Sequence, residues 1–201
     1  MRFNTKYLDN KLFSNAEEGE KCLIVLQHSY TRREEGVEGV LKHWKYSGGK
    51  IATPYLIDTD GKIYKIYEDC YWSYHTGLGR YYDLISIGIT LVNEGPLVRK
   101  GSEWLTVFGS LYRGEVWTNP AVWRDYIYFA KYTPAQVEAT VECVLYLLEK
   151  YSIPRNLPKQ IFEFNRDYFN FKGILFHCSL VYHRTDLSVA FPVEELRKSI
   201  M

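Results

Sequence analysis

Two short apolar segments constrain the fold of this chain more than any other feature of its sequence. Residues 22–26 are apolar without interruption, which is typical of a strand buried on both faces of a parallel or mixed sheet. In residues 85–91 every second residue is isoleucine or leucine, which indicates another strand. The polar residues 27–31 follow the first segment directly. The sequence therefore predicts a sheet in which a buried strand ends in polar side chains.

The remaining predicted elements mix helices with strands. The segment Asp58-Thr59-Asp60-Gly61 indicates a β-hairpin, because Asp-Gly supplies the positive φ of a tight turn. Residues 133–136 (Thr-Pro-Ala-Gln) form a helix start with a capping box. Apolar spacing predicts helices over 37–44 (ended by Gly48-Gly49), 137–148 and 193–200, hairpin strands over 55–57 and 62–67, and a last strand over 173–176.

Residues 94–132 are rich in aromatic residues and contain several glycines and prolines. We expect an irregular insertion here, because long excursions are usually lids or elaborations. The predicted fold is a single α/β domain over residues 1–201, with a central mixed β-sheet flanked by helices and this aromatic-rich insertion. Aromatic residues make up 16% of the chain, including 18 tyrosines. Such a surplus suits a filled core and a ligand groove equally well.

Charge and hydropathy exclude several classes of protein. Lys and Arg total 25 and Asp and Glu total 24, which argues against a nucleic-acid partner bound through bulk positive charge. No apolar run is long enough for a membrane span. The first ten residues lack the apolar core of a signal peptide, so we expect synthesis in the cytoplasm. The four cysteines form no CxxC pair, which excludes a zinc-finger pattern.

Polar residues that could hold a metal follow the first and last predicted strands. A hydrolytic zinc site needs three protein ligands and an open position for water. His28 directly follows the first strand and His177 the last, and two strand ends can meet at one sheet edge. A loop could return Asp186 to the same place, with Arg184 positioned to stabilise an oxyanion. The spacing alone is a weak signal for a metal site, because a lone histidine more often has a structural role.

Six segments, read in order along the chain, form a recognisable pattern. It resembles the zinc-dependent N-acetylmuramoyl-L-alanine amidases, whose fold is shared by phage amidases and peptidoglycan recognition proteins. The insertion is most like phage, endolysin-like versions of that fold. The six segments are Ile24-Val25-Leu26-Gln27-His28-Ser29, the hairpin segment 52–64, Trp72-Ser73-Tyr74-His75-Thr76-Gly77, the strand 86–93, Tyr132-Thr133-Pro134-Ala135-Gln136, and 173–177 with Arg184-Thr185-Asp186.

The resemblance implies a peptidoglycan hydrolase that cuts the amide between the lactyl group of N-acetylmuramic acid and L-alanine. It implies one zinc ion, held by two histidines and an aspartate or cysteine, that activates water. His177 and Asp186 match two of the ligand positions, and Arg184 matches a catalytic basic residue. The matching segments assign substrate contacts to His75, Trp72 and Asn93. The protein would act at the cell wall after phage-type release or as part of a virion.

Two positions depart from the family pattern. The family's first ligand histidine falls on Gln27, and His28 stands one residue later, where strand alternation points it to the other sheet face. Either a β-bulge turns His28 into the site, or the site lacks its third ligand. A glutamate that many members use as a general base falls on Thr90. The alternative function is therefore a catalytically inactive amidase-like module that binds peptidoglycan or forms part of a phage, and a scaffold for protein interactions is a third, weaker one.

Overall fold

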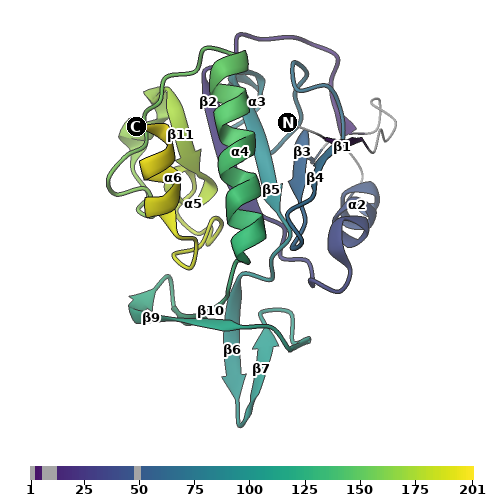
Figure 1. Cartoon of the computed structure of the whole chain (residues 1–201), viewed down its shortest axis with the longest axis vertical. Helices are drawn as coiled ribbons and strands as arrows, with labels where there is room; N and C mark the ends of the chain where they lie inside the picture. The colour runs from purple at the N-terminus through teal and green to yellow at the C-terminus, as the bar shows by residue number, and fades with distance from the viewer. Residues whose placement is uncertain (1–2, 6–12, 48–50) are drawn as a thin grey trace.

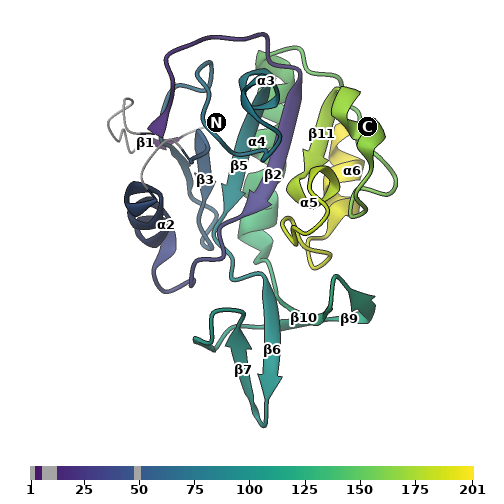
Figure 2. The same ribbon diagram turned by 180° about the vertical axis from the view of Figure 1, so that it is seen from behind.

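A six-stranded mixed sheet lies at the centre of the molecule (Figures 1 and 2). The computed structural model describes residues 3–5, 13–47 and 51–201. Along the sheet the strand order is β1-β4-β3-β5-β2-β11, which confirms the predicted α/β fold with a mixed sheet. The strands are β1 (Asn4–Thr5), β2 (Leu23–His28), β3 (Tyr55–Ile57), β4 (Ile63–Lys65), β5 (Ser86–Leu91) and β11 (Gly173–Phe176).

Helices pack on both faces of this sheet (Figures 1 and 2). Tyr55 and Ile57 belong to the apolar cluster of the long helix α4, whereas the intervening Leu56 belongs to the cluster of α2. This alternation along β3 is the two-residue period of a strand covered on both sides. The helices are α2 (Gly36–Tyr46), α3 (Arg80–Ile85), α4 (Pro134–Lys150), α5 (His177–Leu180), α6 (Val193–Ile200) and the 3-10 helix η1 (Arg166–Asn170).

The predicted helices and the predicted hairpin all form, with ends that differ by a few residues. The short elements α3, η1 and α5 have no counterpart among the predictions. Gly48 and Gly49, which were expected to end the first helix, lie outside the described residues. Within the described ranges, no helix is both long and apolar enough to cross a membrane.

The strand β2 is the buried centre of the sheet. Its residues Leu23 to Leu26 are at most 2% exposed, as the uninterrupted apolar segment predicted. β2 pairs in parallel with β5 on one side and β11 on the other, and its register with β5 runs unbroken from Leu23–Ser86 to His28–Leu91. The strand therefore continues two residues beyond the predicted apolar segment, through Gln27 and His28.

The start of α4 follows the predicted capping box only in part. The hydroxyl of Thr133 accepts a hydrogen bond from the backbone N–H of Gln136, at 3.1 Å, as an N-cap residue does. The Gln136 side chain instead turns into the sheet, and its Nε2 donates to the carbonyls of Val92 (2.9 Å) and Ile57 (3.2 Å). These bonds fix the first turn of α4 to the ends of β3 and β5.

The insertion was expected to be irregular, and this prediction was wrong. It folds into a second, antiparallel sheet that extends from the end of β5 (Figure 1). Its two-residue turn at Arg124–Asp125 has positive φ at both positions without glycine, so the usual Asn-Gly signal of such a turn is missing. In the order β8-β7-β6-β10-β9, the strands are β6 (Pro96–Lys100), β7 (Glu103–Thr106), β8 (Leu111–Tyr112), β9 (Val116–Trp123) and β10 (Tyr126–Ala130).

Gly88, in the middle of β5, allows two side chains to lie close over the strand. A Cβ atom at this position would lie 2.4 Å from the Thr53 methyl carbon and 2.8 Å from Cδ2 of His75. Both side chains are buried, so neither has free space to move into. Glycine at this position is therefore required by the close approach of the segments 52–54 and 73–77 to the sheet.

We predict that Gly88→Ala lowers the free energy of unfolding by about 2–3 kcal/mol, because the new methyl overlaps buried atoms. Urea denaturation measures the loss. Thr53→Ser removes the nearer of the two obstructing carbons. The double variant should lose less unfolding free energy than the sum of the two single losses, since both variants alter one contact. Strictly additive losses would contradict this account of Gly88.

Candidate ligand-binding cleft

A cleft of about 490 Å³ opens at the carboxyl ends of β2, β5 and β11, which run parallel to one another. Open α/β sheets bind ligands at this edge, because the loops that leave the strands surround it. The cleft is within the usual size range for small-molecule sites. Residues from all three strand ends and from the loop after α5 line it, among them Gln27, Tyr30, Thr90, His177, Arg184 and Asp186.

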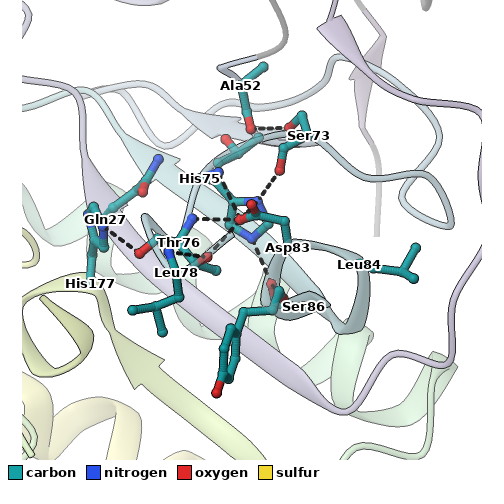
Figure 3. Close-up of polar contacts among 12 residues, drawn as sticks. Gln27, Ala52, Ser73, His75, Thr76, Leu78, Asp83, Leu84, Ser86 and His177 are labelled. Atoms are coloured by element: carbon teal, nitrogen blue, oxygen red, sulfur yellow. Dashed lines mark hydrogen bonds and ion pairs between the residues drawn. The ribbon is translucent and has the colours of Figure 1, made fainter. Parts of the chain in front are cut away.

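A row of polar side chains crosses the sheet at the floor of the cleft. Leu26 of β2 is the register partner of Phe176 of β11, so the next residues, Gln27 and His177, are neighbours (Figure 3). On the other side, Gln27 Nε2 donates to the Thr90 hydroxyl at 2.9 Å. Thr90 is in turn 2.9 Å from the hydroxyl of Thr53. The Gln27 amide is thus engaged with the residue at the position of the expected general base.

His177 and Asp186, predicted as metal ligands, do lie together. His177 Nδ1 is 2.7 Å from Asp186 Oδ2. Its Nε2 is 3.1 Å from the carbonyl oxygen of Thr76 (Figure 3). Both partners are hydrogen-bond acceptors, so the His177 ring is held between a carboxylate and a backbone carbonyl. Burial by itself would raise the pKa of Asp186, but the neighbouring His177 ring lowers it to about 2. The two side chains therefore form a hydrogen-bonded pair buried at the edge of the cleft.

His28 also lines the cleft, but neither of its ring nitrogens joins this pair. The unbroken register of β2 with β5 leaves no β-bulge at His28, so of the two alternatives the one that turns His28 into the site by a bulge does not hold. The ring is 3% exposed, and its Nδ1 is 2.9 Å from the hydroxyl of Tyr132 at the start of α4. Its buried Nε2 has no hydrogen-bond partner and lies against Gly95, where a Cβ would be 2.5 Å away. Burial lowers the pKa of His28 to about 4, so the ring is neutral at pH 7.

The positions of these side chains show whether they could together hold a zinc ion. Across the described part of the chain, no three His, Cys, Asp or Glu side chains lie together as a metal-binding group. His177 and Asp186 supply two donors, the Nε2 of His28 faces Gly95, and the first-ligand position holds the amide of Gln27. A neutral amide is a weak ligand for zinc, which prefers imidazole, thiolate and carboxylate. The donor set does not fit the three-ligand zinc site that the family resemblance implies.

His75 lines the cleft, but the protein already uses both of its ring nitrogens (Figure 3). Nδ1 is 2.7 Å from the carbonyl oxygen of Ser73, and Nε2 is 2.9 Å from the hydroxyl of Ser86. Asp83 accepts hydrogen bonds from the backbone N–H groups of His75 and Thr76. These contacts give His75 a structural part in shaping the cleft wall.

Trp72 and Asn93, the other predicted substrate contacts, lie outside the described lining of the cleft. Trp72 is 5% exposed, and its indole N–H donates to Glu17. Asn93 is 1% exposed, accepts a hydrogen bond from Gly95 N–H and donates to the carbonyl of Ala130. Asn93 therefore joins the two ends of the inserted sheet, where β5 leads into β6 and β10 leads into α4.

Arg124 is a site-forming residue that the sequence did not reveal. It lies at the turn between β9 and β10, and its guanidinium donates to the carbonyls of Cys178 (2.7 Å), Val181 (3.3 Å), Tyr182 and Arg184 (2.6 Å). Those carbonyls belong to α5 and the loop that carries Arg184 and Asp186. Arg184, the basic residue that the resemblance assigns to catalysis, is exposed and lines the cleft. The sequence carries no signal for Arg124, because the turn in which it lies lacks the usual glycine.

The family model for N-acetylmuramoyl-L-alanine amidases matches residues 16–186. The match covers most of the chain, and the protein belongs to this family. No curated protein matches the chain in sequence.

Solved structures show the same fold at low sequence identity. The N-acetylmuramoyl-L-alanine amidase LysC from Clostridium intestinale has a TM-score of 0.57 and 14% identity, with 98% of this chain and 97% of that chain covered. The amidase AmiD from E. coli, in complex with anhydro-N-acetylmuramic acid-L-Ala-D-γ-Glu-L-Lys, has a TM-score of 0.59 and 16% identity, with 96% and 62% covered. The endolysin of the Thermus scotoductus bacteriophage Ph2119 has a TM-score of 0.52 and 14% identity, with 96% and 91% covered.

We predict that His28 makes the fold less stable as the pH falls from about 6.5 to 4. Burial lowers the pKa of folded His28 to about 4 from 6.5. In this pH window the proton therefore binds to His28 of the unfolded chain and not of the folded one, which favours unfolding. His28→Leu removes this term. Between pH 7 and pH 4.5, the variant should lose about 2 kcal/mol less unfolding free energy than the wild type. Equal losses, measured by urea denaturation at both pH values, would contradict a buried neutral His28.

Proposed function

We propose that this protein binds the muramyl-peptide part of peptidoglycan in its cleft and does not hydrolyse it with zinc-activated water. The family supplies the ligand class, since it consists of N-acetylmuramoyl-L-alanine amidases and is typically zinc-dependent. The structural neighbour AmiD is described with a muramyl peptide as its substrate. The same site, kept open but without a catalytic donor set, suits recognition.

One observation carries this proposal: Gln27 and Thr90 hydrogen-bond to each other, at 2.9 Å, on the floor of the cleft. Gln27 occupies the position of the first zinc ligand, and Thr90 that of the glutamate base. Each replacement alone weakens the chemistry, because the amide is a poor ligand and the hydroxyl is a poor base near neutral pH. Together they form a contact in which each side chain satisfies the other.

The residues that remain in the cleft are suited to binding an amide-linked sugar and peptide. Arg184 presents an exposed guanidinium for a carboxylate or carbonyl oxygen of the ligand. Tyr74 and Trp44 contribute aromatic surface to the wall. The buried pair of His177 and Asp186 holds the loop edge at which Arg184 stands. The endolysin among the structural neighbours supports action at the cell wall, after phage-type release or within a virion.

The first test is a pull-down with purified bacterial sacculi. We predict that the protein sediments with sacculi and that the sacculi gain no new amino-terminal L-alanine, measured by mass spectrometry of the released fragments. Arg184→Ala should weaken retention about tenfold, since a charge-assisted hydrogen bond is lost. Arg113→Ala, which removes an exposed arginine outside the cleft lining, is the matched control. New amino-terminal L-alanine, in an amount that rises with the protein concentration, would overturn the proposal.

The second test restores the missing ligand. Gln27→His places an imidazole beside His177 and Asp186. We predict that this variant binds zinc roughly 100-fold more tightly than the wild type, because a gained ligand should change zinc affinity at least as much as the loss of a hydrogen bond that supports a ligand. Isothermal titration with zinc measures the difference. Gln27→Asn is the control, because it keeps an amide and should gain nothing. A wild-type protein that already binds one equivalent of zinc tightly would contradict the analysis of the donor set.

A further inference from the structure

A second groove, of about 730 Å³, lies where the β9–β10 turn of the inserted sheet meets the loops 162–164 and 182–185. We call it the aromatic groove, because aromatic side chains make up much of its lining. They are Tyr30, Trp123, Tyr126, Phe162, Phe164 and Tyr182. The groove is distinct from the cleft, and nothing in the proposed recognition of the peptide uses it.

The rings of the groove pack in edge-to-face pairs, and one of them is largely exposed. Trp123 and Phe162 meet edge to face, with ring centroids 6.3 Å apart, and Phe164 meets Tyr182 in the same way at 5.9 Å. Tyr182 is 76% exposed, whereas the rings beneath it are half-buried. Exposed aromatic surface gathered in a hollow marks a binding site more often than a scattered ring does.

The wall of the groove is held in place before any ligand arrives. Arg124 and Asp125 both have positive φ, at 49° and 70°, a strained conformation for residues other than glycine. The strain is held by the four backbone carbonyls that the Arg124 guanidinium contacts. The same guanidinium lies 5.1 Å from the Trp123 ring and 5.9 Å from the Tyr182 ring. The two aromatic walls are therefore tied to each other through one side chain.

The charged groups of the groove favour an uncharged ligand that carries hydroxyl groups. Asp125 and Glu163 are exposed at its rim and offer carboxylate acceptors. The Arg124 guanidinium is directed at backbone carbonyls, which reduces its capacity to attract an anion. A pyranose ring combines an apolar C–H face, which packs on an aromatic ring, with hydroxyl edges that donate to carboxylates. An acidic stem peptide would meet the two carboxylates instead.

The aromatic groove is continuous with the cleft through Tyr30, which lines both. The Tyr30 hydroxyl is 2.7 Å from the hydroxyl of Thr185 and donates to Asp186 Oδ1 at 3.2 Å. A ligand that passes over Tyr30 therefore leaves the Asp186 edge of the cleft and enters the aromatic groove. In a glycan strand the muramyl sugar is joined directly to further pyranose rings, so a strand whose muramyl peptide lies in the cleft needs an adjoining site of this kind.

We propose that the aromatic groove binds pyranose rings of the glycan strand next to the muramyl peptide held in the cleft. The identity of the biological ligand rests on the proposed function. The ability of the groove to bind sugar rings does not, because it follows from the residues that line the groove. The glycan subsite would give the protein a preference for polymeric wall over short released peptides, because two adjoining sites bind one continuous ligand.

The test uses a β-1,4-linked trimer of N-acetylglucosamine, which carries no peptide. Binding is followed by NMR through the indole N–H of Trp123, assigned with Trp123→Phe. We expect saturable shifts of that signal with a dissociation constant of order 1 mM, as for a small ligand on a partly open site. Tyr182→Ala should weaken binding about fivefold, since one stacking ring is lost. Tyr81→Ala, which removes another exposed tyrosine outside the groove, should leave it unchanged.

The outcomes separate this inference from the proposed function. No binding of the trimer, or binding that Tyr182→Ala leaves unchanged, overturns the glycan subsite even if sacculi still retain the protein. Trimer binding that depends on Tyr182, in a protein that sacculi do not retain, supports the subsite and overturns the proposed function. Concentration-dependent self-association that Tyr182→Ala abolishes, without trimer binding, would assign the groove to a second copy of the chain instead.

Discussion

The parallel pairing of β2 with β5 and β11 determines where binding can occur in this molecule. Three strands that run the same way end at the same edge, so the residues that follow their apolar segments meet there. Gln27, Thr90 and His177 come from three distant parts of the chain and lie side by side for this reason alone. Because both faces of the sheet are covered by helices, the edge is the part of the sheet left open for a ligand.

The same regular pairing separates this protein from the catalytic pattern of its family. A strand alternates its side chains between faces, so a histidine one position late is a histidine on the wrong face. His28 accordingly packs against Tyr132 and Gly95, where it is buried and neutral. A bulge would have moved it, but β2 keeps its full set of ladder bonds with β5. The floor of the cleft holds the amide of Gln27 and the hydroxyl of Thr90, at two positions to which the sequence resemblance assigns catalytic residues.

Local sequence signals predicted the central fold well and the site unevenly. The apolar segment 22–26, the Asp-Gly turn and the Thr133 cap each act within a few residues, and each produced the expected element. The pairing of His177 with Asp186 followed from their places after the last strand. Asn93 and His75 were expected to meet substrate, but Asn93 donates to Ala130 and His75 Nε2 lies at hydrogen-bond distance from Ser86, contacts that the tertiary fold creates.

The inserted sheet shows why such contacts escape a reading of the sequence. Its strands are short, its central turn uses Arg124 and Asp125 in place of glycine, and its packing depends on the body of the protein. Part of the aromatic surplus lies in the core, since Phe129 is fully buried and Trp117 packs beside it. Another part lines the aromatic groove. Composition could not divide the aromatic residues between these two roles, because the division depends on which rings the fold covers.

The guanidinium of Arg124 has a mechanical consequence. Three carbonyls of the loop between α5 and Asp186, and one carbonyl of α5 itself, accept hydrogen bonds from this one side chain of the inserted sheet. Any displacement of the β9–β10 turn is therefore transmitted directly to the loop that carries Arg184 and Asp186. The inserted sheet is therefore mechanically coupled to the cleft, so a ligand that moves the inserted sheet also moves the cleft edge formed by the central sheet.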